Sequence, residues 1–541
     1  MTTRKGLPND VKELQKLLAA AQEQLAATER KAEIAQQQVV ELTSTVSEQK
    51  NKLDRQEKRI AELIAALRGK TREAVDPDQL LLFEMEELEQ LLEEHEQEEK
   101  QARRSRKKHG RRRIPDGLPE EEVVHSLPEE ERLCPHDGQP MPFIRYEISK
   151  QLDYIPAQFK VIVHKRAVYA CPAKHDEATL AIAPKPPQPI EKGLAAPGLL
   201  AAVLVAKFGD HLPVYRQEDI FSRHGIDIRR STIYGWLSGA ADLVAVLVAL
   251  MTQRVLKSKV IHTDDTQVKL IDHDINGTVL ARYWTYVGDH AYPYTVYDFT
   301  RTRGRDGPQK FLKDYSGYLH ADAYSAYDGI YLDSHGEIIE VACWAHCRRY
   351  WWKLREQDPE RASYVLSIVK RLYDVEKLAR DQTSEQRREL RQTQSAPLLQ
   401  ELKVWLDKQR VLPKSNTGEA LTYTLNQWDA LNRYLEDGDL AIDNNISERS
   451  VKPIAIGRKN WLFVGSEEAG RRAGLLMSLI ASCKANRVEP WHYLKDVFTR
   501  LPLPETDLES LLPDRWLEDN PKHRWNIADQ RAEERIAKGD L

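Results

Sequence analysis

Two apolar segments of the chain end in the same short motif, a histidine followed two residues later by an aspartate. The first is His262 to Asp264 in KVIHTDDTQVKL, and the second is His320 to Asp322 in YSGYLHADAYSAY. Side chains alternate between the two faces of a strand, so Asp264 shares a face with His262 and the adjacent Asp265 points to the other face. Only one of the two neighbouring acids can therefore belong to a shared site.

The segments between the two motifs predict how the strands pair. ARYWTYVGDH and YPYTVYDFT have the pattern of an antiparallel pair, and PQKFLKDY follows as a short helix. Three antiparallel strands, a helix and a fourth strand give the order of a ribonuclease-H-like sheet, whose first and fourth strands are neighbours. This order would bring Asp264 and Asp322 together in space.

A third acid lies in AIDNNISERSVKPIAIGRKNWLF, where residues 443–445 can cap a short helix that carries Glu448 and stops at Pro453. The spacing of Asn445 and Glu448 equally fits a capping box, in which Glu448 merely binds a backbone N–H. The cations and aromatic residues around Glu448 favour a site for phosphates and unstacked bases.

Three acids held close together need positive charge between them, and hard oxygen ligands favour Mg²⁺ or Mn²⁺. Asp264, Asp322 and Glu448 therefore predict a two-metal site for phosphoryl transfer, in which one metal activates the attacking oxygen and the other stabilises the leaving oxygen. His262 and His320 are candidates to orient these acids, although a buried structural role fits them too.

Basic and aromatic side chains supply the candidate DNA contacts. They are Arg348, Arg349, Arg449, Lys452, Arg458, Lys459 and Trp461, together with Arg111, Arg112 and Arg113 of the basic run RRSRKKHGRRR. In CWAHC, Cys343 and Cys347 flank His346, and packing is favoured there over metal binding because the neighbouring Trp344 and Tyr350 look buried.

The N-terminal part predicts self-association. From Val11 to Leu67 an apolar residue recurs at every seventh position, which indicates a coiled-coil seam, and the alternative is a single amphipathic helix packed on its own domain. A mostly acidic helix near residues 79–99 then meets the basic run at 103–113, which is too polar to fold alone and can lie on phosphates or simply be solvated.

Residues 134–175 resemble a small zinc ribbon, with Cys134 and Cys171 each opening a knuckle on either side of the strand-like FKVIVHKRAVYA. The second ligand of each knuckle would fall on Asp137 and Lys174, and lysine cannot serve. His136 and His175 are the available substitutes, so Zn²⁺ binding stays an open alternative here.

Three helices are predicted between residues 194 and 247, in GLLAAVLVAKF, YRQEDIFSRHG and STIYGWLSGAADLV, with Ser231 as an N-cap. The second and third have helix-turn-helix proportions, although tandem short helices often serve packing alone. The five scattered cysteines, the polar N-terminus and the lack of an apolar run near 20 residues predict a reducing, cytoplasmic protein with no membrane span.

The sequence as a whole resembles the transposases of the insertion sequence 66 family, which belong to the DDE class. The stretches that carry the resemblance run in family order from about residue 60 to 515. They include QLDYIPAQFKVIVHKRAVYACP, VAKFGDHLPVYRQE, HTDDT, YLHADAYSAYDGIY, VACWAHCRRY and IDNNISERSVKPIAIGRKNWLFVGS. Such long collinear agreement is more specific than a triad of acids.

This resemblance implies that Asp264, Asp322 and Glu448 are the catalytic acids, with Asp265 where the family accepts aspartate or glutamate. It implies a ribonuclease-H-like core interrupted by a helical insertion, and a chain that binds the double-stranded ends of its element and cuts and joins them to target DNA. Small companion proteins encoded by the same element, and a place with the bacterial nucleoid, are further implications. The zinc segment is where this chain departs from the family pattern.

The expected fold class is multidomain α+β. The expected segments are a coiled coil (1–70), an acidic helix and basic linker (71–115), a zinc-ribbon-like segment (116–182), a helix-turn-helix-like helical domain (190–250), the core's first part (255–350), a helical insertion (351–437), the core's second part with Glu448 (438–485) and a C-terminal segment (486–541). Competing functions are a catalytically silent DNA-binding regulator, a metal-dependent nuclease without strand transfer and a coiled-coil scaffold.

Overall fold

The computed structural model describes residues 122–125, 139, 143–146, 148, 157–170 and 180–525. The chain divides into two compact units, Met1–Tyr154 and Ile155–Leu541, and the sheets and helices of the described residues belong to the second. Several predictions lie outside the described residues. They are the coiled coil, the acidic and basic segments over 71–115, and the candidate residues in these segments and in the zinc-ribbon-like segment. Those candidates are Arg111, Arg112, Arg113, Cys134, His136, Cys171 and His175.

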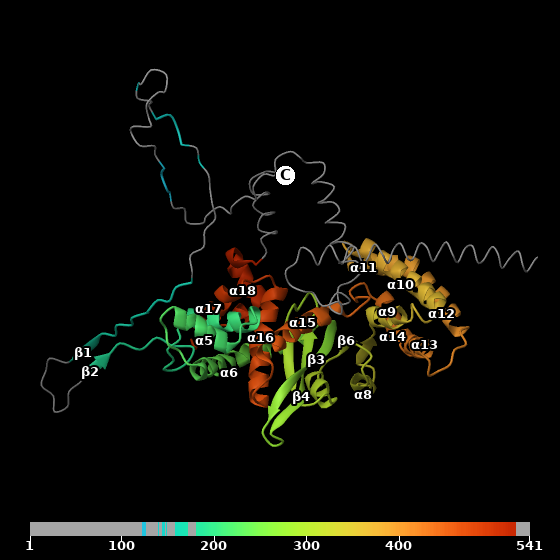
Figure 1. The fold of residues 1–541 in the computed structure, drawn as a ribbon, viewed down its shortest axis with the longest axis horizontal. Helices are drawn as coiled ribbons and strands as arrows, with labels where there is room; N and C mark the ends of the chain where they lie inside the picture. Colours follow the sequence, from blue (N-terminus) through green and yellow to red (C-terminus); the bar gives the residue numbers. More distant parts are fainter. Residues whose placement is uncertain are drawn as a thin grey trace, which may run out of the picture. The chain divides into compact units, whose positions relative to one another are not determined.

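A five-stranded mixed sheet forms the centre of this unit, with the strand order β5-β4-β3-β6-β7 (Figure 1). Its strands are β3 (Val260–Asp272), β4 (Gly277–Val287), β5 (Thr295–Thr300), β6 (Gly317–His320) and β7 (Ile338–Val341). The pairs β3–β4 and β4–β5 are antiparallel, whereas β3–β6 and β6–β7 are parallel. The predicted neighbourhood of the first and fourth strands is therefore confirmed, and β7 is a strand that the pattern did not predict.

Short elements connect the strands. Helix α7 (Asp306–Phe311) precedes β6, as predicted, and α8 (Ser325–Asp333) joins β6 to β7. The zinc segment contributes a small two-stranded sheet, in which β1 (Val168–Ala170) pairs with β2 (Leu180–Ile182). Of the predicted strand FKVIVHKRAVYA, only its last residues are in β1, because only they have a partner strand.

The helices before the sheet lie where three helices were predicted. They are α4 (Pro197–Leu204), the π-helical segment η2 (Val205–Gly209), α5 (Val214–Arg223) and α6 (Arg230–Val255). The predicted cap at Ser231 is wrong, because α6 already begins at Arg230. The side chain of Glu218 on α5 performs that role, since its Oε1 accepts the Arg230 backbone N–H at 3.2 Å and its Oε2 lies 2.8 Å from Arg230 Nε.

Helix α6 is longer than predicted and, by length and composition alone, apolar enough to cross a membrane. This contradicts the expectation that no apolar run approaches that length. Its apolar residues recur at helical spacing and enter the large core shared with α4, α16 and α17, among them Ile233, Ala240, Val244 and Met251. Burial in that core accounts for the composition of the helix.

A helical region follows β7 and has its own hydrophobic core. Its elements are α9 (Trp344–Lys353), α10 (Pro359–Ala379), α11 (Ser384–Leu390), η3 (Arg391–Ser395), α12 (Ala396–Asp407), α13 (Asn416–Asn426), α14 (Trp428–Asn432) and η4 (Arg433–Leu435). The predicted helical character of residues 351–437 is thus present, and it begins earlier, at Trp344. The buried Trp344 and Trp351 join this core to the end of the sheet.

The chain then returns to the sheet through α15 (Asn445–Trp461), which packs on β3 and β4, and α16 (Glu467–Ala485), which packs on β5 and α6 (Figure 1). The last elements of the described residues are α17 (Pro490–Arg500), η5 (Glu509–Leu511), α18 (Pro513–Asp519) and η6 (Pro521–His523). Pro453 does not stop α15, contrary to the prediction. An interior proline costs about 3 kcal/mol, but the buried Ile454 and the bonds of Arg458 to β3 hold the helix together beyond it.

Candidate active site

The register of two parallel strands brings the first two acids together. On β3 and β6, His262 is the direct partner of His320, and the two rings lie 4.8 Å apart between centroids. Asp264 and Asp322 each follow two residues later, Asp264 inside β3 and Asp322 just beyond the end of β6. The prediction that both strands end at the motif is therefore wrong for the first, because β3 continues to Asp272 in its pairing with β4. The repeated His-x-Asp motif therefore reflects the register of two neighbouring parallel strands.

Asp264 stands in surroundings that oppose its ionisation. Its Oδ1 accepts the backbone N–H of Asp265 at 2.7 Å. Burial raises the pKa of Asp264 to about 8, and the negative charges of Asp322 and Glu448 act in the same direction. The three predicted acids are thus close enough for two of them to disfavour the charge of the third.

The carboxyl group of Asp322 is perturbed in the same direction by a different balance of charges. Burial is the main cause that raises its pKa, and the charge of Asp265 adds to it, while His346 and Arg303 lower it. Asp322 follows the end of β6, in the short connection to α8. Its carboxyl group therefore feels both the negative charge of Asp265 and the positive charge of Arg303.

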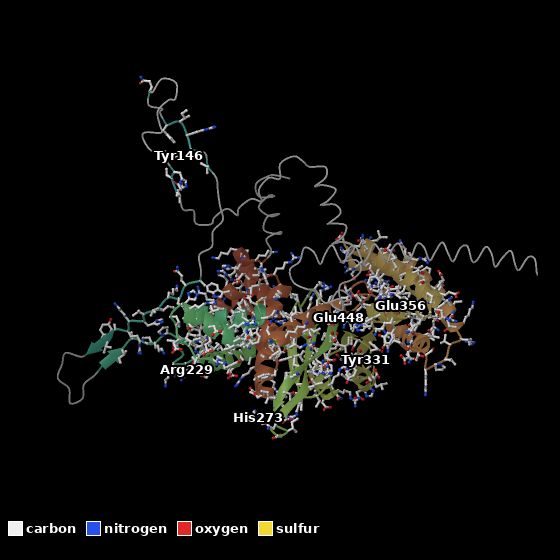
Figure 2. All side chains as sticks on the ribbon, viewed as in Figure 1. Tyr146, Arg229, His273, Tyr331, Glu356 and Glu448 are labelled. Carbon is white, nitrogen blue, oxygen red and sulfur yellow. The ribbon has the colours of Figure 1, made fainter. Side chains whose placement is uncertain are left out.

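Glu448 reaches the site from the first turn of α15. Its Oε1 lies 3.5 Å from Arg349 Nη2 and 3.6 Å from His346 Nε2, both on α9. The capping-box alternative is wrong, because α15 begins at Asn445 and its N-cap residue Asn444 makes no side-chain cap bond. Figure 2 shows Glu448 toward the end of the sheet opposite the β3–β4 hairpin, which His273 marks.

Asn444, which the pattern did not single out, ties the start of α15 to β3. Its Nδ2 donates to the Thr263 carbonyl at 2.8 Å, and its Oδ1 lies 3.0 Å from His262 Nδ1. Its backbone N–H donates to Cys343 Sγ at 3.2 Å. Since Asn444 is buried and Glu448 is four residues further on, this side chain fixes where the third acid enters.

The two histidines differ in their bonding. His262 has Asn444 as a partner, whereas neither ring nitrogen of His320 has a hydrogen-bond partner among the described residues. Burial lowers the pKa of His262 to about 4, and burial with the neighbouring His262 lowers that of His320 well below its usual value. Both rings are therefore uncharged near neutral pH, and each lies two residues before its acid, Asp264 or Asp322.

Asp265 points away from Asp264, as the alternation predicts, and is held by two arginines. Arg282 Nη1 donates to its Oδ2 at 2.9 Å, and Arg303 donates to its Oδ1 through Nε at 3.0 Å and Nη2 at 2.8 Å. The Asp265 side chain is only 3% exposed. Arg303, in the loop TRTRGRD, also lies 3.7 Å over the Tyr324 ring and was not a sequence candidate.

The donor chemistry of the acids suits a hard divalent cation. Among the described residues, no three histidine, cysteine or acidic side chains are gathered tightly enough to enclose a metal ion as they stand. Asp264, Asp322 and Glu448 nevertheless come from adjacent elements, and the charges of the other two raise the pKa of the first. A cation would remove that repulsion, so the residues present fit Mg²⁺ or Mn²⁺.

The predicted DNA contacts do not form one group. Arg349 lies against Glu448, and Arg458 is bonded through Nη1 to Thr266 Oγ1 at 3.1 Å and to the Gln267 carbonyl at 2.6 Å. Lys452 and Lys459 are exposed on α15, whereas Arg348 is half-buried on α9. Arg449 and Trp461 instead line a cavity on another side of α15.

The CWAHC segment packs as predicted, with one exception. Cys343 and Cys347 are buried, and Cys347 Sγ lies 3.3 Å from Thr424 Oγ1, while Trp344 is fully buried. Tyr350 is 40% exposed, so its predicted burial is wrong, because it lies on the outer face of α9 against Tyr423. His346 belongs to the acids and not to the thiols, and burial lowers its pKa to about 4.

Profiles of known protein families match several parts of this chain. The sequence profile described as "Transposase IS66 family" matches residues 192–472, which is more than half of the chain. Further profiles match residues 478–513 ("IS66 C-terminal element"), 131–173 ("zinc-finger binding domain of transposase IS66") and 55–123 ("Transposase C of IS166 homeodomain"). The zinc-finger match includes Cys134 and Cys171 but ends before His175.

Two relatives from Sinorhizobium fredii match over much of their length. Uncharacterized protein y4qI is 31% identical over 534 residues, which cover 94% of this chain and 97% of the relative. Uncharacterized protein y4hP is 31% identical over 435 residues, which cover 76% of this chain and 78% of the relative.

Proposed function

The chain belongs to the IS66 family of transposases, and from that premise we propose that it is a DDE transposase acting on the ends of its own insertion element. It would bind the terminal repeats as double-stranded DNA, cut them, and join the freed 3′ ends to target DNA. The observation that carries this proposal is the register of β3 and β6, which brings Asp264 on β3 and Asp322 just beyond β6 close to each other and to Glu448.

The sheet order supports a ribonuclease-H-like core for this chemistry. Three antiparallel strands are followed by a helix and by a fourth strand that pairs with the first, and the third acid enters from a later helix. The helical region from α9 to η4 is then the insertion that separates the second acid from the third. In such a core the three acids are far apart in the sequence and come together only in the fold.

Asp264, Asp322 and Glu448 are the residues that would hold the metal. When bound, Mg²⁺ or Mn²⁺ would polarise the attacking oxygen and stabilise charge on the leaving oxygen. Asn444 keeps α15 at a fixed place on β3, so that Glu448 is presented to the two strand acids. Arg349 brings positive charge next to Glu448, where the DNA phosphate would lie.

Other parts of the chain are assigned roles by the same proposal. The helices α5 and α6, the segment matched by the zinc-finger profile and the basic run at 103–113 would bind DNA outside the acids. The heptad segment would hold copies of the chain together. Small companion proteins of the element are further proposed partners, and the bacterial cytoplasm, in contact with the nucleoid, is the proposed location.

The test uses the purified full-length protein, a labelled duplex that carries the element's terminal repeat, and a target plasmid. With Mg²⁺ or Mn²⁺ present, the wild type is expected to cleave the end and join it, and Asp322→Ala is expected to do neither while still binding the duplex. Asp328→Asn, which changes an exposed acid on α8, is the matched control and should retain both reactions.

The possible results separate the competing functions. Cleavage without joining would identify a nuclease. Binding without chemistry, even when the element's companion proteins are added, would identify a regulator. Equal activity of Asp322→Ala and the wild type would refute the assignment of the acids.

A further inference from the structure

A second site lies beside α15, on the face away from Glu448. A cavity of about 440 Å³ is bounded by η2, the ends of β4 and β5, α15 and α16. Ile446, Ser450, Pro453 and Trp461 line it at helical spacing, whereas Glu448 falls on the other side of the same helix. The cavity is therefore separate from the acids, although one helix forms a wall of both.

The lining of this cavity carries positive charge and no acidic side chain. Its basic residues are Lys207 on η2, His211 after it, Arg449 on α15 and Lys484 on α16, and of these His211 favours its neutral form, since burial and the charge of Lys484 lower its pKa. Among the described residues, none of the four makes an ion pair with a carboxylate, and Lys484 Nζ lies 6.0 Å from the Trp525 ring centre. Arg449 is near enough to the buried Asp443 for its charge to oppose the rise that burial causes in the pKa of that acid, and the remaining positive charge around the cavity, on Lys207 and Lys484, favours an anionic ligand.

Lys207 is the least solvated of these cations. Its Nζ lies 5.4 Å from the Phe208 ring centre and 5.7 Å from that of Tyr234, and burial lowers its pKa to about 8. A half-buried ammonium near two aromatic rings is stabilised by an incoming anion, because the anion replaces water that the group has lost. The π-helical turn η2 places this lysine at the wall of the cavity.

The rest of the lining is apolar and aromatic. Tyr297, Ile454, Met477 and Ile480 form it together with Trp461 and Phe208, and the hydroxyl of Tyr297 is already bonded to the Ser450 carbonyl. The cavity opens to solvent, since Lys484 and Ala485 are exposed and Ile446 is 37% exposed. Its volume lies in the range of about 300–1,000 Å³ that is usual for small-ligand sites.

We propose that this cavity receives one unstacked nucleotide of the DNA strand, with the base against the apolar and aromatic lining and its phosphate on Lys207, Arg449 and Lys484. A planar base suits the lining, and stacking on aromatic side chains tolerates any base. The identity of the anion as DNA rests on the proposed function. Removing a base from a duplex costs a few kcal/mol, which the cations and the stacking would offset.

The position of the cavity defines which nucleotide is bound. A helix with its side chains is about 10–12 Å across, and successive phosphates of one strand rise by about 3.4 Å. The bound nucleotide is therefore at least about three steps along the strand from the phosphate that the acids attack. The cavity would hold a displaced nucleotide near the cut and would take no part in the chemistry.

The first experiment uses 2-aminopurine deoxyriboside 5′-monophosphate as the probe, with full-length protein and EDTA, so that no catalysis occurs. Its fluorescence is expected to change saturably on binding. Lys207→Met should weaken binding at least about tenfold, because it removes one charge-assisted contact. Ala485→Phe, which narrows the mouth from an exposed position, should do the same without disturbing the core.

Two controls separate this proposal from the catalytic one. Lys370→Met removes an exposed lysine from α10, and Asp322→Ala removes an acid, and both should bind the probe like the wild type. Thermal unfolding of each variant checks that it is folded. Failure of Asp322→Ala to lose cleavage would refute the catalytic assignment while leaving the result for the cavity readable.

The second experiment places 2-aminopurine at successive positions of a terminal-repeat duplex. One position should show the fluorescence of an unstacked base bound to protein, and Lys207→Met and Ala485→Phe should abolish that signal. The proposal is overturned if both variants bind the mononucleotide as the wild type does. It is also overturned if inorganic phosphate competes as well as the nucleotide, because the base would then make no contact.

Discussion

His262 and His320 are direct partners in the register of β3 and β6, and their ring centroids lie 4.8 Å apart. The pair sits immediately before the two strand acids and is buried and uncharged, because burial lowers the pKa of each ring. Of the two, only His262 bonds to Asn444. The two histidines are therefore similar in burial and charge but differ in hydrogen bonding.

This difference predicts unequal effects of the same substitution. His320→Leu should change the free energy of unfolding by less than about 1.5 kcal/mol, because it replaces a ring without polar partners by an apolar side chain of similar size. His262→Leu should cost about 1–3 kcal/mol, because it leaves the buried Asn444 Oδ1 unpaired. Denaturant midpoints of the two variants measure the contrast, and equal losses would contradict it.

The pKa of Asp264 predicts a pH dependence of stability in the metal-free protein. Its folded pKa of about 8 lies above the ordinary value, so between about pH 4 and 8 the unfolded chain is ionised at this residue while the folded one is protonated. Unfolding then releases a proton, and rising pH favours unfolding until both states are ionised above about pH 8. The wild type should lose stability over this window relative to Asp264→Asn.

Thermal unfolding at several pH values in EDTA tests this expectation. The melting temperature of Asp264→Asn should exceed that of the wild type increasingly as the pH rises from 4 toward 8. Saturating Mg²⁺ should reduce the difference, since a cation between the carboxylates removes the repulsion. A constant difference across the window would show that Asp264 does not titrate there.

Asp265 is predicted to be an anchor of two arginines. Asp265→Ala leaves Arg282 and Arg303 without their common partner. The loss should be about 2 kcal/mol, which is less than the roughly 3–5 kcal/mol of a fully buried pair, because Arg303 is 38% exposed and partly screened by solvent. Asp328→Ala on exposed α8 should cost less than about 0.5 kcal/mol in the same assay.

Loss of end cleavage in Asp265→Ala at full stability would assign this residue to the reaction instead. The two readouts, unfolding and cleavage, therefore need to be taken on the same preparation.

The last turn of α15 offers two adjacent cations with separate roles. Lys459 is exposed, so Lys459→Ala should weaken binding to DNA of any sequence and reduce the slope of log affinity against log salt by about one. Arg458 bonds to β3, so Arg458→Ala should also lower the melting temperature. Fluorescence anisotropy at several salt concentrations measures this slope. An unchanged slope for Lys459→Ala would show that Lys459 does not contact DNA.

Much of the central sheet could be predicted because its information is local. The alternation and composition around His262 and His320 indicate strands, and the antiparallel segments between them leave few ways to connect a fourth strand to the first. The same alternation separates Asp264 from Asp265, and the structure confirms that separation through the two arginines that hold Asp265.

Tertiary packing decided what local rules could not. Pro453 should end a helix by its own chemistry, yet α15 continues because Arg458 and Ile454 are held by the sheet. Ser231 has the right chemistry for a cap, but Glu218 of the preceding helix satisfies α6. Tyr350 resembles its buried neighbours in composition and lies on the outer face of α9. Each of these three outcomes depends on a contact with a residue distant in sequence, or on which face of a helix points toward solvent.

The sequence by itself determined which residues could perform the chemistry, since carboxylates, cations and aromatic rings are fixed by composition and spacing. Only the tertiary structure decided their surroundings. Asn444 acquires its role by reaching Thr263 and His262 across 181 and 182 residues, and Lys207 by lying near Arg449 and Lys484 around one cavity. Such contacts depend on the free energy of packing the whole unit, which no short stretch of sequence contains.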